Sequence, residues 1–269
     1  MITGIKSLTA EVTKVQEIHP GFFDMEFYLP EIAGSCIPGQ FMMVKPRKST
    51  SPYLGRPMGI YDWDETKGTV NILFAVKGKG TGTEILAETK VGDELPVVAP
   101  LGRGYKFYDT DKKVIVIAGG MGIASLFPVI KHLHDKKVDL KVLMGAHNAG
   151  KILATDKLDK LGVQYILYTD DGSAGIKGWP TDTLVQMLHE EKCDRVYCCG
   201  TLRMLENTSG ICERVDVPCQ VSLEERMGCG IGICMGCVCH HKKSDGGREL
   251  ARVCYEGPVF DSKEVIWHG

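Results

Sequence analysis

Short runs of alternating hydrophobic and polar residues, separated by Pro and Gly, fill the N-terminal part of the chain. Alternation with a period of two is typical of strands that bury one face, and closely spaced turn residues indicate short antiparallel connections. We therefore predict an antiparallel β-barrel over residues 1–108. Its expected strands are AEVTKVQEI (10–18), FDMEFYL (23–29), QFMMVKP (40–46), GTVNILFAV (68–76) and GDELPVVAP (92–100).

The pattern changes after Lys112, where hydrophobic runs become continuous and alternate with amphipathic segments. VIVIAGG (114–120) is an unbroken run of the kind found in a strand that is buried on both faces. Strand-like and helix-like segments then alternate, which predicts a doubly wound, parallel α/β sheet over residues 109–219. The expected helices are 124–136, 158–162 and 181–191, and the other expected strands are 140–146, 164–170 and 195–200.

The C-terminal segment, residues 220–269, is rich in Gly and Cys. Cys229, Cys234, Cys237 and Cys254 follow the order C-x4-C-x2-C with a distant fourth Cys, which is the spacing of a plant-type [2Fe–2S] ligand set. Glycines in the loop MGCGIGICMGC allow the backbone to wrap closely around inorganic sulfide. We therefore predict a [2Fe–2S] module that transfers single electrons.

Other interpretations of these cysteines are weaker. A zinc site is conceivable because His240 and His241 follow Cys239, but zinc ligands usually pair C-x2-C with a second C-x2-C or with His. A disulfide framework is not expected in a chain of 269 residues without a secretory signal. We interpret Cys239 as a thiol that the cluster does not need, because the four-ligand spacing is complete without it.

Composition limits the classes of function. The chain is 43% hydrophobic and 25% charged with a formal net charge of -2, so nothing indicates nucleic-acid binding. The longest uncharged stretch, Val114–Ile130, contains Gly and Pro and is shorter than a membrane span. The start of the chain has no apolar export segment, and the 11 Cys fit a reducing compartment. We therefore expect a cytoplasmic protein with no membrane span.

Three segments of the predicted sheet are candidates for a dinucleotide. Gly119-Gly120-Met121-Gly122 joins a buried strand to a helix, where glycines admit a pyrophosphate and the helix N-terminus attracts it. Cys199-Gly200-Thr201 follows the strand that we expect to be the last of this region. Asp170 and Asp171 follow another strand and can accept from an adenosine 2′-hydroxyl. The alternatives are a tight turn without a ligand, a pair of buried small residues and an Asx turn.

Two segments of the predicted barrel suit a flavin. Arg56-Pro57-Met58-Gly59 stands at the start of the strand-like GIYDWD, and an arginine fork can donate two parallel hydrogen bonds to a diphosphate. Gly80-Thr81-Gly82-Thr83 precedes a short helical stretch, EILAE, and N–H groups at a helix start bind anions. Each segment alone is more often an ordinary loop, but together with the downstream segments they indicate a flavin.

These features resemble the ferredoxin–NADP reductase superfamily and, within it, the electron-transfer subunits of type B dihydroorotate dehydrogenase. The likeness covers essentially the whole chain, and its C-terminal motifs are the most specific. The segments that carry it are GRPMGIYD (55–62), TDDGSAGIKG (169–178), SLEERMGCGIGICMGCVC (222–239) and RVCYEGPVFDSKEVIW (252–267).

The resemblance implies an electron relay in pyrimidine biosynthesis. It implies that hydride moves between NAD(H) and FAD, and that single electrons move through the [2Fe–2S] cluster to the FMN of a separate catalytic subunit, which oxidises dihydroorotate to orotate. It also implies a heterotetramer with two copies of each subunit. In this family FAD would contact Arg56 to Gly59, Leu73-Phe74-Ala75 and Gly80-Thr81, and the cluster would bind Cys229, Cys234, Cys237 and Cys254.

The sequence departs from the family pattern at three points. Gly59 replaces a serine, which removes a hydroxyl expected near the flavin ring. GKGTGTEIL carries two extra residues, so the phosphate contact falls on Gly80-Thr81 or on Gly82-Thr83. Cys-Gly-Thr replaces the usual Cys-Gly-Pro, which is a milder change.

Two other functions stay open at this stage. One is an FAD and [2Fe–2S] subunit of an NAD(P)H–ferredoxin or sulfide-linked oxidoreductase. The other is a zinc-stabilised interaction protein without flavin. The GPVF segment that follows Cys254 favours the dihydroorotate dehydrogenase subunit over the first of these.

Overall fold

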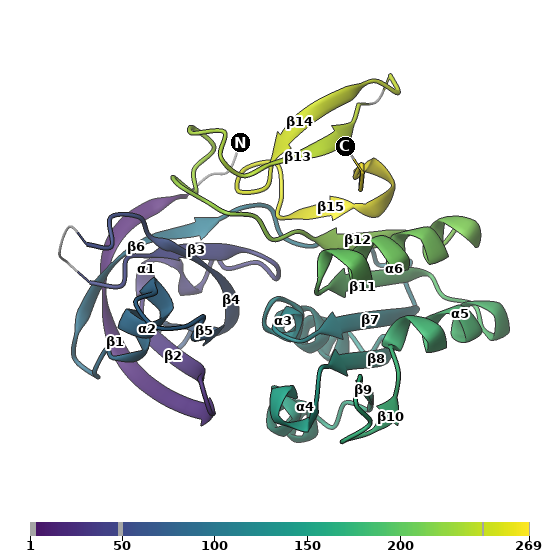
Figure 1. The fold of residues 1–269 in the computed structure, drawn as a ribbon, viewed down its shortest axis with the longest axis horizontal. Helices are drawn as coiled ribbons and strands as arrows, with labels where there is room; N and C mark the ends of the chain where they lie inside the picture. Colours follow the sequence, from purple (N-terminus) through teal and green to yellow (C-terminus); the bar gives the residue numbers. More distant parts are fainter. Residues whose placement is uncertain (1–3, 48–50, 244, 269) are drawn as a thin grey trace. The chain divides into compact units, whose positions relative to one another are not determined.

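A computed structural model describes residues 4–47, 51–243 and 245–268 of the chain (Figure 1). It divides into two compact units. The first unit contains Met1–Gly104, Glu224–Val238 and Ala251–Pro258, and the second contains Tyr105–Leu223, Cys239–Leu250 and Val259–Gly269. The C-terminal segment therefore contributes to both units. The three-part division at residues 108 and 219 stays a prediction.

The first unit is built on a closed, antiparallel barrel with the strand order β1-β2-β5-β4-β3-β6. Its core is a continuous cluster of buried apolar side chains that includes Met25, Phe27, Ile60 and Ile72. The barrel predicted from the alternating pattern is confirmed. Its elements are β1 (Lys6–His19), β2 (Phe22–Tyr28), α1 (Pro30–Ala33), β3 (Phe41–Val44), β4 (Arg56–Asp64), β5 (Thr69–Ala75), α2 (Gly82–Ala87) and β6 (Glu94–Leu101).

The second unit contains a seven-stranded sheet with the order β10-β9-β8-β7-β11-β12-β15 (Figure 1). All neighbouring strands are parallel except β12 and β15. The predicted doubly wound sheet is confirmed. Its elements are β7 (Lys113–Gly119), α3 (Gly122–Asp135), β8 (Asp139–Ala146), η1 (Ala149–Lys151), α4 (Thr155–Leu161), β9 (Tyr165–Thr169), β10 (Ile176–Lys177), α5 (Pro180–Glu190), β11 (Arg195–Cys199), α6 (Leu202–Arg214), β12 (Cys219–Ser222), β15 (Val259–Asp261) and η2 (Ser262–Glu264).

The order of the strands reverses at β7. Strands β8 and β9 extend the sheet to one side of β7, whereas β11 and β12 extend it to the other. The carboxyl ends of β7 and β11 therefore form a topological switch point, where open α/β sheets bind ligands. The expectation that β11 is the last strand of this region is wrong, because β12 and β15 continue the sheet beyond it.

The remaining strands, β13 (Val238–Lys242) and β14 (Arg248–Arg252), form a two-stranded sheet between the third and fourth predicted cluster ligands. Within the part of the chain that the structure describes, no helix is both long and apolar enough to cross a membrane.

Candidate cofactor sites

The four predicted cluster ligands all lie in the first unit. Cys229, Cys234 and Cys237 belong to the loop before β13, and Cys254 follows β14. The thiol of Cys229 interacts with that of Cys234 and the thiol of Cys254 with that of Cys237, and a weaker charge interaction links Cys254 with Cys229. The N–H of Val253 donates to the carbonyl of Cys237 at 2.9 Å and joins the two segments. Two thiol pairs match a binuclear centre, because each iron of a [2Fe–2S] cluster with four Cys ligands takes two of them.

Among the residues that the structure describes, no three His, Cys, Asp or Glu side chains are grouped so that they could hold a single metal ion. A structural zinc site needs four donors around one ion. All four thiols lie in one unit at the C-x4-C-x2-C…C spacing of a [2Fe–2S] ligand set, and this spacing favours iron–sulfur over zinc. Cys239 lies on β13, in the second unit.

Backbone N–H groups point at the ligand sulfurs. The N–H groups of Ile233 and Cys234 each donate to Cys229 Sγ at 3.4 Å, and that of Cys254 donates to Cys237 Sγ at 3.4 Å. Burial raises the pKa of Cys229, but N–H donors outweigh burial and lower this pKa to about 6. Burial, with the Cys237 hydrogen bond, raises the pKa of Cys254 to about 12. Cys229 is thus prepared as the thiolate that a metal binds.

Glycines of the cluster loop are required by conformation and packing. Gly230 and Gly232 have φ angles of +72° and +83°, in the left-handed region. A Cβ on Gly230 would overlap Met43 of β3, and a Cβ on Gly232 would lie 2.9 Å from the Tyr255 side chain. The loop therefore packs tightly on the barrel and on the turn that carries Cys254.

The apolar side chains of the same loop face outward. Ile233 is 75% exposed, Met235 is 48% exposed and Ile231 is 36% exposed. Together these three residues form what we call the cluster-loop patch. An exposed apolar patch of this kind is typical of an interaction surface.

The predicted flavin segments gather at one end of the barrel. Strand β4 begins at Arg56 and runs antiparallel to β5, which ends at Ala75, so the start of one lies beside the end of the other. The guanidinium of Arg56 lies directly against Gly82, because a Cβ on Gly82 would come within 2.6 Å of Arg56 Cζ. The structure thus brings together an arginine fork and the start of α2, two features suited to a diphosphate.

The turn before α2 is ordered by its threonines. Thr81 is the N-cap, and its hydroxyl accepts from the N–H of Glu84 at 3.3 Å and donates to the carbonyl of Gly78 at 2.7 Å. The hydroxyl of Thr83 accepts from the N–H of Lys77 at 3.0 Å. The first-turn N–H groups of a helix have no partner within the helix, and those of α2 begin at Gly82, beside Arg56.

The other predicted flavin residues are mostly buried in the barrel or paired within its sheet. Met58, Leu73 and Phe74 are buried, and Phe74 stacks on Phe23 with the ring centroids 5.6 Å apart. Gly59 pairs with β3 in the barrel. Since the side chains of Leu73 and Phe74 are enclosed, a flavin contact at these positions would involve the main chain.

The two nucleotide turns of the second unit lie against each other at the switch point. A Cβ on Gly122 would overlap the carbonyl of Cys199, and a Cβ on Gly119 would lie 3.3 Å from Gly200 Cα. Gly120 has a φ of +52°, and a Cβ there would meet nothing within 4 Å. Gly119, Gly122 and Gly200 therefore permit close packing of two turns, whereas Gly120 faces open space where a pyrophosphate can approach.

Asp170 and Asp171 have different surroundings. Asp171 Oδ1 accepts from the N–H and hydroxyl of Ser173 at 2.9 and 2.6 Å, which is Asx-turn geometry and holds the pKa of Asp171 below its usual range. Asp170 Oδ1 accepts from Trp179 Nε1 at 3.1 Å, and Asp170 Oδ2 lies 3.0 Å from His147 Nδ1. The carboxylate of Asp170 is therefore held by side chains from two other segments, whereas that of Asp171 is held chiefly by Ser173 of its own turn.

Sequence reasoning missed His147 and Trp179. His147 directly follows β8, and Trp179 stands immediately before α5. Asp170 directly follows β9, so all three residues lie near carboxyl ends of parallel strands. The position of a polar or aromatic residue just after such a strand was the one available signal.

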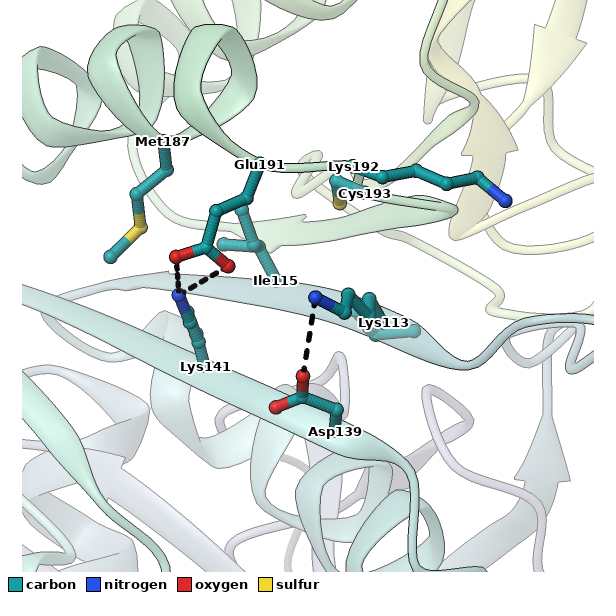
Figure 2. Close-up of a pocket in the computed structure, with 9 residues that line it drawn as sticks. Lys113, Ile115, Asp139, Lys141, Met187, Glu191, Lys192 and Cys193 are labelled. Carbon is teal, nitrogen blue, oxygen red and sulfur yellow. Dashed lines mark hydrogen bonds and ion pairs between the residues drawn. The ribbon is translucent and has the colours of Figure 1, made fainter.

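A charged hollow lies at the other end of the strands of this sheet, and it is no candidate for the nucleotide site (Figure 2). Lys113 and Asp139 begin β7 and β8, so the hollow lies at the amino ends of the strands. Its charges are paired: Lys141 Nζ lies 2.8 Å from both carboxylate oxygens of Glu191, and Lys113 Nζ lies 4.0 Å from Asp139 Oδ2. Burial raises the pKa of the neighbouring Cys193 to about 11, so its thiol is a poor nucleophile.

Comparison with known proteins gives the family. The model of the "Iron-sulfur cluster binding domain of dihydroorotate dehydrogenase B" matches residues 224–266, and that of the "Oxidoreductase NAD-binding domain" matches residues 116–210. The electron transfer subunit of dihydroorotate dehydrogenase B (NAD(+)) from Desulforamulus reducens is 38% identical over 265 residues, 97% of this chain and 99% of the relative. The chain belongs to this family. The subunit of the same name from Clostridium acetobutylicum is 38% identical over 85% of this chain and 86% of its own length.

Solved structures agree with the fold. A chain of the NADH-dependent reduced ferredoxin-NADP oxidoreductase has a TM-score of 0.82 and 26% identity, covering 97% of this chain and 91% of that one. A ferredoxin NADP+ reductase from Neisseria gonorrhoeae with bound FAD and NADP has a TM-score of 0.66 and 15% identity, covering 83% of this chain and 94% of that one. The family resemblance inferred from the sequence motifs is confirmed.

Proposed function

We propose that this chain carries electrons between NAD(H) and a separate, FMN-containing catalytic subunit that oxidises dihydroorotate to orotate in pyrimidine biosynthesis. Bound FAD supplies the exchange between hydride and single electrons, and a [2Fe–2S] cluster supplies the single-electron path. The observation that carries this proposal is the set of four cysteines, at [2Fe–2S] spacing and in one unit, within the segment that matches the iron–sulfur domain of this family. Residence in the cytoplasm and a complex with two copies of each subunit remain predictions.

We assign the cluster to Cys229, Cys234, Cys237 and Cys254. Each pair of thiols would hold one iron, and the N–H groups aimed at Cys229 and Cys237 would stabilise the thiolate charge. The cluster-loop patch provides an apolar surface close to the ligands, at which the catalytic subunit can dock.

We assign the FAD diphosphate to Arg56 and to the first turn of α2. The adjacency of Arg56 and Gly82 favours the N–H groups of Gly82-Thr83 over those of Gly80-Thr81, since the N–H of Gly80 already donates to Glu84 Oε2 at 2.6 Å. For NAD(H), Gly120 admits the pyrophosphate at the switch point. Asp170 directly follows β9, which lies two strands from β7 and about 10 Å away at the usual strand spacing, a distance suited to the adenosine ribose.

The purified chain alone is expected to reduce artificial dyes with NADH but not to convert dihydroorotate to orotate. It holds the nucleotide and electron-transfer sites, whereas the substrate belongs to the catalytic subunit. Spectrophotometric assays of dye reduction and of orotate formation, with and without a family catalytic subunit, test this. Orotate formation by the isolated chain, or a catalytic subunit that gains no NAD-linked activity from it, would contradict the proposal.

Asp170→Asn is expected to reduce the preference for NADH over NADPH. A 2′-phosphate beside the Asp170 carboxylate would suffer like-charge repulsion, so the unchanged chain should prefer NADH by at least about tenfold in kcat/KM, or ~1.4 kcal/mol. Asp171→Asn is the matched control, because the Asp171 carboxylate is occupied by its own turn. Steady-state dye reduction with both nucleotides is the measurement. A loss of preference in the Asp171 variant and not in the Asp170 variant would overturn the assignment.

A second candidate function is supported by one observation. The chain of the NADH-dependent reduced ferredoxin-NADP oxidoreductase aligns with almost the whole of this chain at a TM-score of 0.82. An NAD(P)H–ferredoxin oxidoreductase subunit would have the same flavin and cluster sites but another partner. NADH-linked reduction of ferredoxin by a complex purified from the native cell, without orotate formation, would favour this alternative.

A further inference from the structure

Arg252 connects the two segments that carry the cluster ligands. Its Nη1 donates to the carbonyl of Gly232 at 2.6 Å, in the loop between the first two ligands. Its own carbonyl accepts from the N–H groups of Tyr255 and Glu256, both at 2.9 Å, and so folds the turn that contains Cys254. One residue thus holds the three-cysteine loop against the fourth ligand.

The Arg252 guanidinium is fixed on three sides. Its Nε donates to Glu256 Oε2 at 3.0 Å, and its Nη2 donates to Glu256 Oε1, which makes a two-bond fork. Its Cζ lies 4.6 Å from the centroid of the Tyr255 ring, and this ring packs directly against Gly232. The side chain is 29% exposed. An ordinary surface ion pair has none of these additional contacts.

The charges of Arg252 and Glu256 lie at different places relative to the cluster loop. The positive guanidinium touches the cluster loop through Gly232, and the negative carboxylate of Glu256 lies on another edge of the guanidinium. Reduction adds an electron to a cluster that already bears thiolate and sulfide charge. A nearby positive charge therefore favours the reduced form, and a nearby negative charge disfavours it.

We propose that Arg252 is a positioning residue that closes the cluster loop, and that Arg252 and Glu256 shift the reduction potential of the cluster in opposite directions. This inference depends on the proposed [2Fe–2S] assignment. Neither residue is a cluster ligand, so the effect would act through loop geometry and through charge.

Three variants of the full chain, purified without oxygen, separate these effects. Arg252→Gln removes the charge and the fork, Arg252→Lys keeps the charge without the fork, and Glu256→Gln removes only the counter-charge. Lys67→Gln, on the β4–β5 hairpin, controls for a change in net charge. The measurements are the cluster midpoint potential, by dye-mediated titration, and the rate of bleaching in the presence of an iron chelator.

The expected order of midpoint potentials is Glu256→Gln highest, then the unchanged chain together with Arg252→Lys and Lys67→Gln, and Arg252→Gln lowest. Both Arg252 variants should bleach several times faster than the unchanged chain, because neither replacement spans Gly232 and Glu256 together. If Arg252→Gln retains no iron, the bleaching rate of Arg252→Lys and the midpoint potential of Glu256→Gln still test the proposal. Potentials that stay equal or move in the same direction, or an Arg252→Lys chain that bleaches no faster, would overturn the inference. An unchanged chain without a [2Fe–2S] spectrum would instead contradict the proposed function.

Discussion

Cys237→Ser is expected to leave the purified chain with little iron and little cluster absorbance, whereas Cys239→Ser is expected to keep both. Cys237 is 2% exposed, and its Sγ accepts from the N–H of Cys254 at 3.4 Å. A serine hydroxyl is a poor ligand for iron in a soft, sulfur-rich site. Cys239 lies on β13 outside the two thiol pairs, so its loss should not remove a ligand.

Iron content per chain and the visible spectrum after anaerobic purification measure this pair of variants. The two substitutions make the same chemical change two residues apart, so general effects of serine in this segment cancel in the comparison. A Cys239→Ser chain that loses its colour while Cys237→Ser keeps it would show that the ligand assignment is wrong.

Gly82→Ala is expected to weaken FAD binding about 10- to 100-fold while the barrel stays folded. The added Cβ would meet the end of the Arg56 side chain, which can move away without disturbing the backbone. Moving the guanidinium removes charge-assisted hydrogen bonds to the diphosphate, each worth about 1.5–3 kcal/mol.

FAD affinity, from flavin retained on dilution or from fluorescence titration of the flavin-free chain, gives the readout, with thermal unfolding measured alongside. Gly34→Ala is the matched control in the same unit, because a Cβ at Gly34 would meet nothing within 4 Å and its φ is −76°. Equal FAD affinity in the two variants would mean that Arg56 and the start of α2 do not form the diphosphate site.

The sequence predicted those features that depend on local pattern or covalent spacing. Period-two alternation identified the barrel strands, and the continuous apolar run at 114–120 identified β7. Burial of one face of a strand gives alternating residues, and burial of both faces gives a continuous apolar run, so both patterns can be read from adjacent positions. The cluster ligands were recognised in the same way, because three of them lie within nine residues of each other in C-x4-C-x2-C.

Helix α6 and strand β12 were not predicted, for identifiable reasons. Asn207, Thr208, Ser209 and Gly210 stand in the middle of α6, and all are weak helix formers that tertiary packing has overridden. Strand β12 spans four buried residues, too few for a periodic signal. A strand as short as β12 depends on the strands that it pairs with, which the local sequence does not contain.

Contacts between distant segments were also beyond sequence reasoning. The glycine-rich turn at 119–122 suggested a pyrophosphate, but Gly122 is needed chiefly because the Cys199 carbonyl lies against it. The choice between Asp170 and Asp171 depends on His147 and Trp179, which are separated from Asp170 in the chain and reach it only in the folded sheet.

The central claim is that one chain takes electrons from NADH and delivers them singly to a [2Fe–2S] cluster. Anaerobic titration of the purified chain with NADH, followed by visible absorption and by electron paramagnetic resonance, tests it most directly. We expect about one FAD and two irons per chain, flavin bleaching on addition of NADH, and the paramagnetic signal of a one-electron-reduced [2Fe–2S] cluster. Zinc in place of iron, or a cluster that NADH leaves oxidised while the flavin is fully reduced, would contradict it.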